Sequence, residues 1–110
     1  MRKIEKQMNV AISRQQNWSS ANTMVGISDE GNAMVYLHGH HIATVNPRGD
    51  VSVRIDTLYD WPTMTTKSRL RAIGVPVVTK KGRTYVNGCD IENYGYQAMT
   101  VDYNETRYAV

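Results

Sequence analysis

The chain has little of the residue types that cross-link a fold or carry it through a membrane. Its 110 residues include no Phe, one Cys, three Pro and three His. A single cysteine excludes an internal disulfide, so the fold must be held by packing, as is usual in a reducing compartment. No window approaches the roughly 18 apolar residues of a membrane-spanning helix, and no apolar core of a signal peptide follows the basic N-terminus. Membrane insertion and secretion are disfavoured, and a cytoplasmic location is expected.

Size and charge exclude several further classes of protein. Hydrophobic residues make up 41% of the chain and charged residues 21%, which is typical of a globular protein and not of a disordered one. The net charge of +3 has the wrong sign for an acidic DNA mimic, and the length is too small for a large multi-part enzyme. One domain spanning residues 1–110 is expected, in which residues 104–110 could be flexible.

The periodicity of apolar residues predicts an α+β fold. Between Arg2 and Gln16 the apolar residues recur at helical spacing, which predicts an amphipathic helix, with Trp18 folding back as an anchor in the core. Alternation of apolar and polar residues, separated by short turns, then predicts an antiparallel meander of about four strands. These strands are expected at residues 23–28, 33–38, 41–45 and 51–55.

The second half of the chain predicts a short central helix and a hairpin. Residues 66–73 form the body of the helix, which Thr63 or Thr65 can cap, and Leu70 and Ile73 face one side of it. This helix is expected to cover a face of the sheet, with its cations spread over the exposed remainder. A C-terminal hairpin follows, and a further strand is allowed near its end. The expected ranges are 75–79, 83–86 and 99–103.

The charge pattern of the second half singles out a basic segment. Between Trp61 and Cys89 there are six cations and no acid, followed by an acidic C-terminal stretch. If one surface collected these cations it could bind phosphates, with Trp61 and Tyr85 stacking on bases. The alternative is a solvated helix face and an ordinary turn that the acidic stretch partly neutralises. The cations are Lys67, Arg69, Arg71, Lys80, Lys81 and Arg83.

A second candidate group is the run of histidines. His38, His40 and His41 lie close in sequence, and Asp50 or Glu30 could add an oxygen ligand. A metal site needs three or four convergent ligands, and no other histidine exists. We therefore predict a polar, half-exposed turn, with no metal and no cofactor.

Enzymatic signatures are missing from the sequence. The glycines are spaced as turn residues and form no phosphate-binding loop, and no pair of carboxylates suggests general acid and base roles. Cys89 could be a nucleophile only if a histidine approached it, and it is expected instead to pack as a small hydrophobe. No catalytic residue is predicted.

Tyrosine is unusually frequent. Seven Tyr and two Trp with no Phe give nearly every aromatic side chain a polar tip, which suits half-buried positions and binding surfaces. A C-terminal cluster could dock on a partner or cover the core, and the second interpretation is slightly favoured. It comprises Tyr94, Tyr96, Tyr103 and Tyr108.

Several stretches of the first 75 residues carry a resemblance to a known group of proteins. They are residues 1–8, Asn17-Trp18-Ser19 with Asn22-Thr23, residues 37–43, and Trp61 to Ala72 with its Thr-Thr-Lys-Ser-Arg-Leu segment. Together they resemble a family of small accessory proteins encoded by tailed bacteriophages of enterobacteria. This family has no assigned activity, so the resemblance implies expression in the cytoplasm of the infected cell and no catalytic residue.

Two functions follow as hypotheses. In the first, the protein binds and modulates a host protein, such as a defence nuclease, a CRISPR or restriction effector, or the transcription machinery. In the second, it binds nucleic acid through the basic segment 67–83, so that binding weakens steeply with salt. An open edge strand would also allow a homodimer by strand addition.

Overall fold

The computed structural model describes residues 1–94 and 100–102. The first half contains helix α1 (Lys3–Arg14) and strands β1 (Trp18–Ser20), β2 (Thr23–Ile27), β3 (Ala33–Leu37), β4 (His40–Val45) and β5 (Val51–Arg54). Two helices follow, α2 (Ile55–Asp60) and α3 (Met64–Ala72). The remaining elements are β6 (Val77–Lys80), β7 (Arg83–Val86), β8 (Cys89–Asp90), the 3-10 helix η1 (Ile91–Tyr94) and β9 (Thr100–Asp102).

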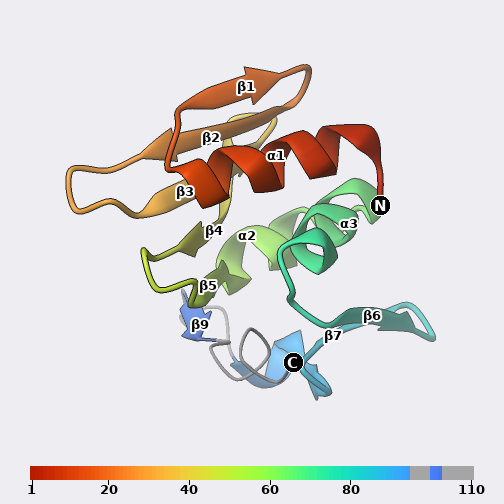
Figure 1. Ribbon diagram of the computed structural model, residues 1–110. Coiled ribbons are helices and arrows are strands. Elements are labelled where there is room, and N and C mark those ends of the chain that lie inside the picture. The colour runs from red at the N-terminus through yellow and green to blue at the C-terminus, as the bar shows by residue number, and fades with distance from the viewer. Residues whose placement is uncertain (95–99, 103–110) are drawn as a thin grey trace.

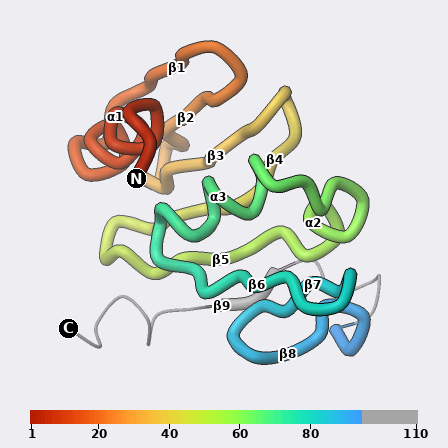
Figure 2. The backbone as a smooth tube through the Cα atoms, turned by 90° about the vertical axis from the view of Figure 1, so that its right-hand side faces the viewer, coloured from red at the N-terminus to blue at the C-terminus, as the bar shows by residue number. Residues whose placement is uncertain are grey.

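The strands form two antiparallel sheets. The larger has six strands in the order β1-β2-β3-β4-β5-β9, and the smaller has three in the order β6-β7-β8. The α+β class, the meander and the C-terminal hairpin are confirmed, and the late strand predicted near residues 99–103 is present as β9. Figures 1 and 2 place the smaller sheet at the end of the molecule opposite β1 and α1.

The larger sheet buries one of its faces. The register aligns Val25, Val35, Ala43 and Val53 across β2 to β5, and all four are at most 1% exposed. Alternation within a strand sends their neighbours to the other face, where the side chains are half-buried or exposed, except at Ile42 of β4, which is buried. Helix α1 lies in front of β2 and β3 in Figure 1, and its Met8 is fully buried.

Local signals set the helix ends and the turns. Thr63 caps α3, because its Oγ1 accepts a hydrogen bond of 3.1 Å from the backbone N of Thr66. The β3–β4 connection is the two-residue turn His38-Gly39, with φ angles of 52° and 79°. Positive φ at both positions is the type I′ geometry that matches the twist of a hairpin, and it explains the glycine there.

Two short elements differ from the sequence expectations. The chain forms β1 at Trp18–Ser20 and α2 at Ile55–Asp60, where the sequence predicts neither a further strand nor a further helix. Trp18 is half-buried and packs against the core from β1. Both elements are too short to display a period, so the larger sheet and the helices of the core decide their conformation.

Two expectations about the ends and the environment of the chain remain. The predicted flexibility of residues 104–110 lies outside the described residues. No helix within residues 1–94 and 100–102 is long and apolar enough to span a membrane.

Candidate protein-docking pocket

The six cations of the basic segment do not share a surface. Lys67 and Arg69 are only 7% and 3% exposed, so the expectation that α3 spreads its cations over a solvent face is wrong for both. Arg71 and Arg83 are exposed, but each is held by a partner within the described structure.

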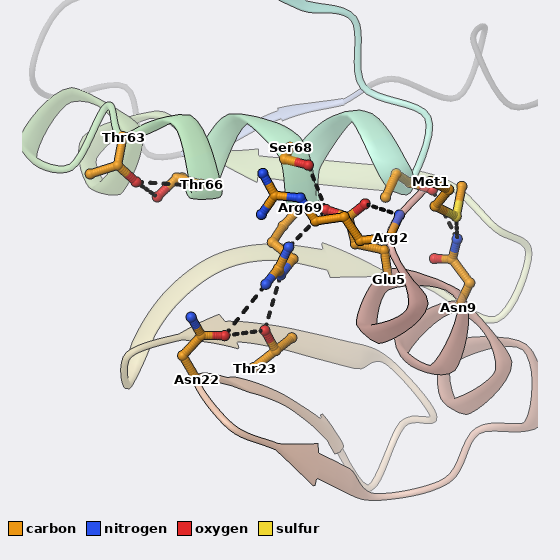
Figure 3. Close-up of polar contacts among 11 residues, drawn as sticks. Met1, Arg2, Glu5, Asn9, Asn22, Thr23, Thr63, Thr66, Ser68 and Arg69 are labelled. Carbon is orange, nitrogen blue, oxygen red and sulfur yellow. Dashed lines mark hydrogen bonds and ion pairs between the residues drawn. The ribbon is translucent and has the colours of Figure 1, made fainter.

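Arg69 lies at the centre of a buried polar network. Its Nη1 is 2.8 Å from Oε2 of Glu5, which is 2% exposed, and its Nε donates to Thr23 Oγ1 at 3.0 Å. The same Glu5 oxygen accepts a 2.6 Å bond from Ser68, and its other oxygen accepts from the backbone N of Arg2. Figure 3 shows these side chains converging between α1, α3 and the start of β2. The network joins three elements far apart in sequence.

The network also sets the ionisation of its carboxylate. Burial raises the pKa of Glu5, but hydrogen bonds from Ser68, from the Arg2 backbone and from Arg69, together with the charge of Arg69, outweigh it. The net effect holds the pKa of Glu5 below its ordinary value of 4.5. Glu5 is therefore a carboxylate at neutral pH, and Arg69 is its counter-ion.

Three other cations hold the smaller sheet in place. Lys67 Nζ donates to Thr79 Oγ1 at 2.7 Å, and Arg71 Nη1 donates to the backbone O of Val77 at 2.9 Å, so both join α3 to β6. Burial, with the charge of Arg71 beside it, lowers the pKa of Lys67. Arg83 forms ion pairs with Asp90, at 2.7 Å, and with Glu92. These contacts engage most of the cations that the sequence had made available for binding a phosphate.

The remaining two cations lie at the tip of the β6–β7 hairpin. Lys80 and Lys81 are exposed and line an open hollow together with Val78, Tyr85 and Gly88. Of the predicted pair of stacking aromatics, Tyr85 lies in this hollow, whereas Trp61 lines a different pocket. The structure therefore divides the cations of the predicted site into three groups. Some are buried, some bind other residues of the fold, and only the hairpin pair Lys80 and Lys81 is left exposed at the hollow.

The histidine run does not gather metal ligands. Among residues 1–94 and 100–102, no three His, Cys, Asp or Glu side chains lie close enough together to hold a metal ion. His38 is exposed in the β3–β4 turn, and His40 and His41 point to opposite faces of β4 because of their positions in the strand. Asp50 binds Asn46 and Arg48 instead.

His41 belongs to a polar cluster on the open face of the sheet. Its Nε2 lies 2.9 Å from the backbone O of Ala43, and its Nδ1 lies 3.0 Å from Nη1 of Arg54. Because a carbonyl oxygen only accepts, Nε2 carries the proton and Nδ1 accepts from the guanidinium. Burial and the charge of Arg54 lower the pKa of His41, although Asp56, bound to Arg54 through two bonds, opposes this. His41 is neutral in this arrangement.

Cys89 and the described tyrosine of the C-terminal cluster are also placed. Cys89 is exposed in β8, so the expectation that it packs as a small hydrophobe is wrong. The Asn87-Gly88 turn, with both φ angles positive, places it at the surface. Tyr94 packs against the core, as the covering interpretation expected. The other members, Tyr96, Tyr103 and Tyr108, lie outside the described residues.

An apolar hollow lies where the β3–β4 turn meets α2 and α3. Its volume is about 130 Å³. Trp61 forms one wall and stacks on the ring of His40, with a centroid separation of 4.7 Å and an interplanar angle of 24°. The floor is apolar, since Leu37 and Ile42 are 3% and 2% exposed. The complete lining is Leu37, His38, His40, Ile42, Thr57, Trp61, Thr63 and Thr66, and it is called the Trp61 pocket below.

A bulge in β4 builds the sheet side of this pocket. The register shifts so that Val35 pairs with Ala43 but Tyr36 pairs with His41, which leaves Ile42 as an extra residue. Ile42 and Ala43 are consequently buried in succession, and His40 pairs with Leu37 on the helix side of the strand. The bulge therefore turns His40 toward Trp61.

The helices build the other side of the pocket. α2 ends at Asp60, and the backbone N of the capping residue Trp61 donates to the O of Thr57 at 2.8 Å. Pro62 cannot continue the helix. Thr63 then caps the start of α3, and its hydroxyl lies 2.9 Å from that of Thr66. Both threonines line the pocket, and Figure 3 shows their contact. Two of the three threonine hydroxyls that line the pocket are thus hydrogen-bonded to each other, which leaves the hollow largely apolar.

Large exposed apolar side chains lie on the same segment of the chain as the residues on the helix side of the pocket. Tyr59 is 42% exposed, Trp61 48% and Met64 80%. Aromatic residues and methionine are enriched where proteins bind one another, and an aromatic beside a small apolar pocket is a typical hot spot. Of these residues the sequence singled out Trp61 alone, and for base stacking. The signal for the others is the run of residues 58–64, which is rich in apolar residues.

Comparison with known proteins gives the origin of the chain. No curated protein and no solved structure matches it significantly. A family model described as Kyanoviridae Gp96 protein matches residues 1–108. The expected phage origin is confirmed, whereas a tailed phage of enterobacteria as the source stays a prediction. The chain belongs to the Kyanoviridae Gp96 protein family, a family of phage proteins.

Proposed function

We propose that this protein is a phage accessory protein that binds a host protein in the cytoplasm of the infected cell and modulates it without catalysis. The single observation that carries the proposal is the apolar Trp61 pocket, whose wall residue Trp61 is 48% exposed. Membership of a phage protein family supplies the setting, in which a host protein is the natural target.

The size of the pocket favours a protein partner over a small substrate. Pockets for cofactors and drug-sized ligands measure about 300–1,000 Å³. The Trp61 pocket, of about 130 Å³, is too small for such a ligand but suits one side chain of a partner. Truncation of a central aromatic in such a contact commonly costs about 2 kcal/mol or more of binding free energy.

The target class follows from the setting. A small phage protein that acts by stoichiometric binding can block a host defence enzyme, such as a CRISPR or restriction effector, or redirect the transcription machinery. Each target needs one complementary surface and no active site on the phage protein.

Nucleic-acid binding through residues 67–83 is the alternative. The observation in its favour is the exposed pair Lys80 and Lys81 beside Tyr85. Two cations release few counter-ions, so such binding would be weak and would depend only shallowly on salt. This alternative and the homodimer are kept as outcomes of the test.

The test compares two variants of the tagged full chain in a lysate of the phage's host, with and without nuclease. Trp61→Ala removes the pocket wall, and Lys80→Ser with Lys81→Ser removes the exposed cations as a matched surface control. We expect a stoichiometric host protein that survives nuclease, that the lysine variant retains, and that Trp61→Ala loses at least about tenfold.

Three results would contradict the proposal. Equal capture of that host protein by Trp61→Ala would place the contact elsewhere on the chain. Loss of all captured material with nuclease and with the lysine variant would favour the nucleic-acid alternative. Recovery of the chain bound only to itself would favour the homodimer.

A further inference from the structure

The turn between β7 and β8 holds the only asparagine of the chain that is followed by glycine, Asn87-Gly88. Asparagine is among the thermolabile residues of proteins. Its side-chain amide carbon can be attacked by the backbone N of the next residue, and glycine obstructs that attack least because it has no Cβ. One position of the chain is therefore chemically suited to modify itself.

The structure leaves the reacting groups of this pair accessible. Asn87 and Gly88 are both exposed, and a Cβ built on Gly88 would meet nothing within 4 Å. The backbone N of Asn87 donates to the O of Pro76 at 2.9 Å. Within the described part of the chain, no hydrogen bond holds the side-chain amide of Asn87 or the N of Gly88. Water and base therefore reach both groups.

The turn belongs to a hairpin that opens at little cost. The φ angles of Asn87 and Gly88, 53° and 79°, are those of a type I′ turn, whose fixed dihedral angles do not suit ring closure. Ring closure therefore needs the turn to open. β8 has two residues and is an edge strand of the smaller sheet, tied to β7 by its pairing and by the ion pair of Arg83 with Asp90, in which the arginine is 56% exposed. Short exposed segments of this kind open far more easily than the whole domain unfolds.

We propose that Asn87 is a site of spontaneous deamidation in the folded protein. The N of Gly88 loses its proton to base and forms a bond with Cγ of Asn87, and the side-chain nitrogen leaves as ammonia, which closes a cyclic imide. Water then adds to one of the two imide carbonyls and opens the ring to aspartate or isoaspartate. One water is consumed and one ammonia is released, and nothing is oxidised or reduced.

The product changes the charge of a defined surface. Gly88 lines the hollow at the tip of the β6–β7 hairpin together with Lys80, Lys81 and Tyr85. A carboxylate at position 87 lowers the net charge of the chain by one, from +3, and places an anion next to this hollow. Deamidation thereby weakens any binding of phosphate by the two lysines. The inference is independent of the proposed function, since it involves no residue of the Trp61 pocket.

The test incubates the full chain at mildly alkaline pH, folded and in concentrated urea, and maps its peptides by mass spectrometry. Replacement of the side-chain NH2 by OH raises the mass of the peptide that contains Asn87. Asn93, which is followed by Tyr94, is the internal control. We expect conversion at Asn87 in the folded chain, slower than in urea, and none at Asn93 in the same period. The rate should rise about tenfold per pH unit, because the reactive form of the Gly88 N is the one that has lost its proton.

Three variants sharpen the test. Arg83→Ser removes the ion pairs with Asp90 and Glu92, so it should speed conversion in the folded chain by about twofold or more and leave the rate in urea unchanged. Arg48→Ser, at the β4–β5 turn, is the matched control and should leave both rates unchanged. Asn87→Asp supplies the mass and charge of the product and should gain no further mass.

Two results would overturn the proposal. Complete conversion in urea with no conversion of the folded chain would show that the turn protects Asn87. Conversion at Asn93 as fast as at Asn87 would remove the role of Gly88. An Arg83→Ser rate equal to that of the wild type would overturn the part assigned to opening of the β7–β8 hairpin.

Discussion

Removal of Arg69 should destabilise the protein far more than removal of a surface arginine. Arg69→Met keeps the length of the side chain but leaves the Glu5 carboxylate, 2% exposed, without its counter-ion and Thr23 without its donor. Loss of one member of a buried ion pair costs about 3–5 kcal/mol of unfolding free energy. That is a large part of the roughly 5–15 kcal/mol that stabilises an ordinary domain.

The assay is urea unfolding and thermal melting of five proteins, which are the wild type, Arg69→Met, Arg48→Met, Glu5→Leu and the Glu5→Leu, Arg69→Met double variant. At 4–8 °C per kcal/mol, Arg69→Met should lower the melting temperature by at least about 12 °C. Arg48→Met is the matched control, since it breaks the Arg48–Asp50 pair of 3.5 Å whose arginine side chain is 80% exposed. Pairs of that kind are worth about 0.2–1 kcal/mol.

Adding Glu5→Leu to Arg69→Met removes the stranded carboxylate. The double variant should be more stable than the two single losses together predict, by about 1–3 kcal/mol of coupling energy. A loss below about 1 kcal/mol for Arg69→Met, equal to that of Arg48→Met, would refute the assignment of Arg69 to a buried network.

Three further outcomes are expected. The lowered pKa of His41 means that its neutral form favours folding, so stability should fall as the pH drops below about 6.5, and His41→Asn should remove that part of the pH dependence of the melt. Gly39→Ala should cost about 1 kcal/mol in urea unfolding through its φ of 79° alone, because nothing lies within 4 Å of the added Cβ. Lys80→Ser with Lys81→Ser should shift the melting temperature by no more than a few degrees, since exposed substitutions change stability by about 0.5 kcal/mol or less.

Much of the fold could be predicted because its signals are local. The alternation in residues 23–55 sets the buried row of Val25, Val35 and Val53, and the turn His38-Gly39 fixes the hairpin between β3 and β4. The Thr63 cap of α3 was among the two that the sequence allowed. β1 and α2 could not be predicted, because three and six residues are too few to show a period.

The site depends on contacts that no local pattern contains. Glu5 and Arg69 are 64 residues apart, so the charge count of the basic segment could not distinguish a buried counter-ion from a surface cation. His40 meets Trp61 only because the extra residue Ile42 in β4 changes the register. A pattern of charges or aromatics in the sequence identifies candidate binding residues. Long-range packing then decides which of these residues are exposed.

The central claim is that the Trp61 pocket is the contact surface for a host protein. The most direct measurement is the dissociation constant of the captured host protein for the wild-type chain, for Trp61→Ala and for the Lys80, Lys81 double variant, by calorimetry on folded samples. The account predicts that Trp61→Ala weakens binding by about 30-fold or more, the effect of a 2 kcal/mol hot spot, and that the lysine variant stays within about twofold. An unchanged constant for Trp61→Ala, with binding lost in the lysine variant, would contradict it.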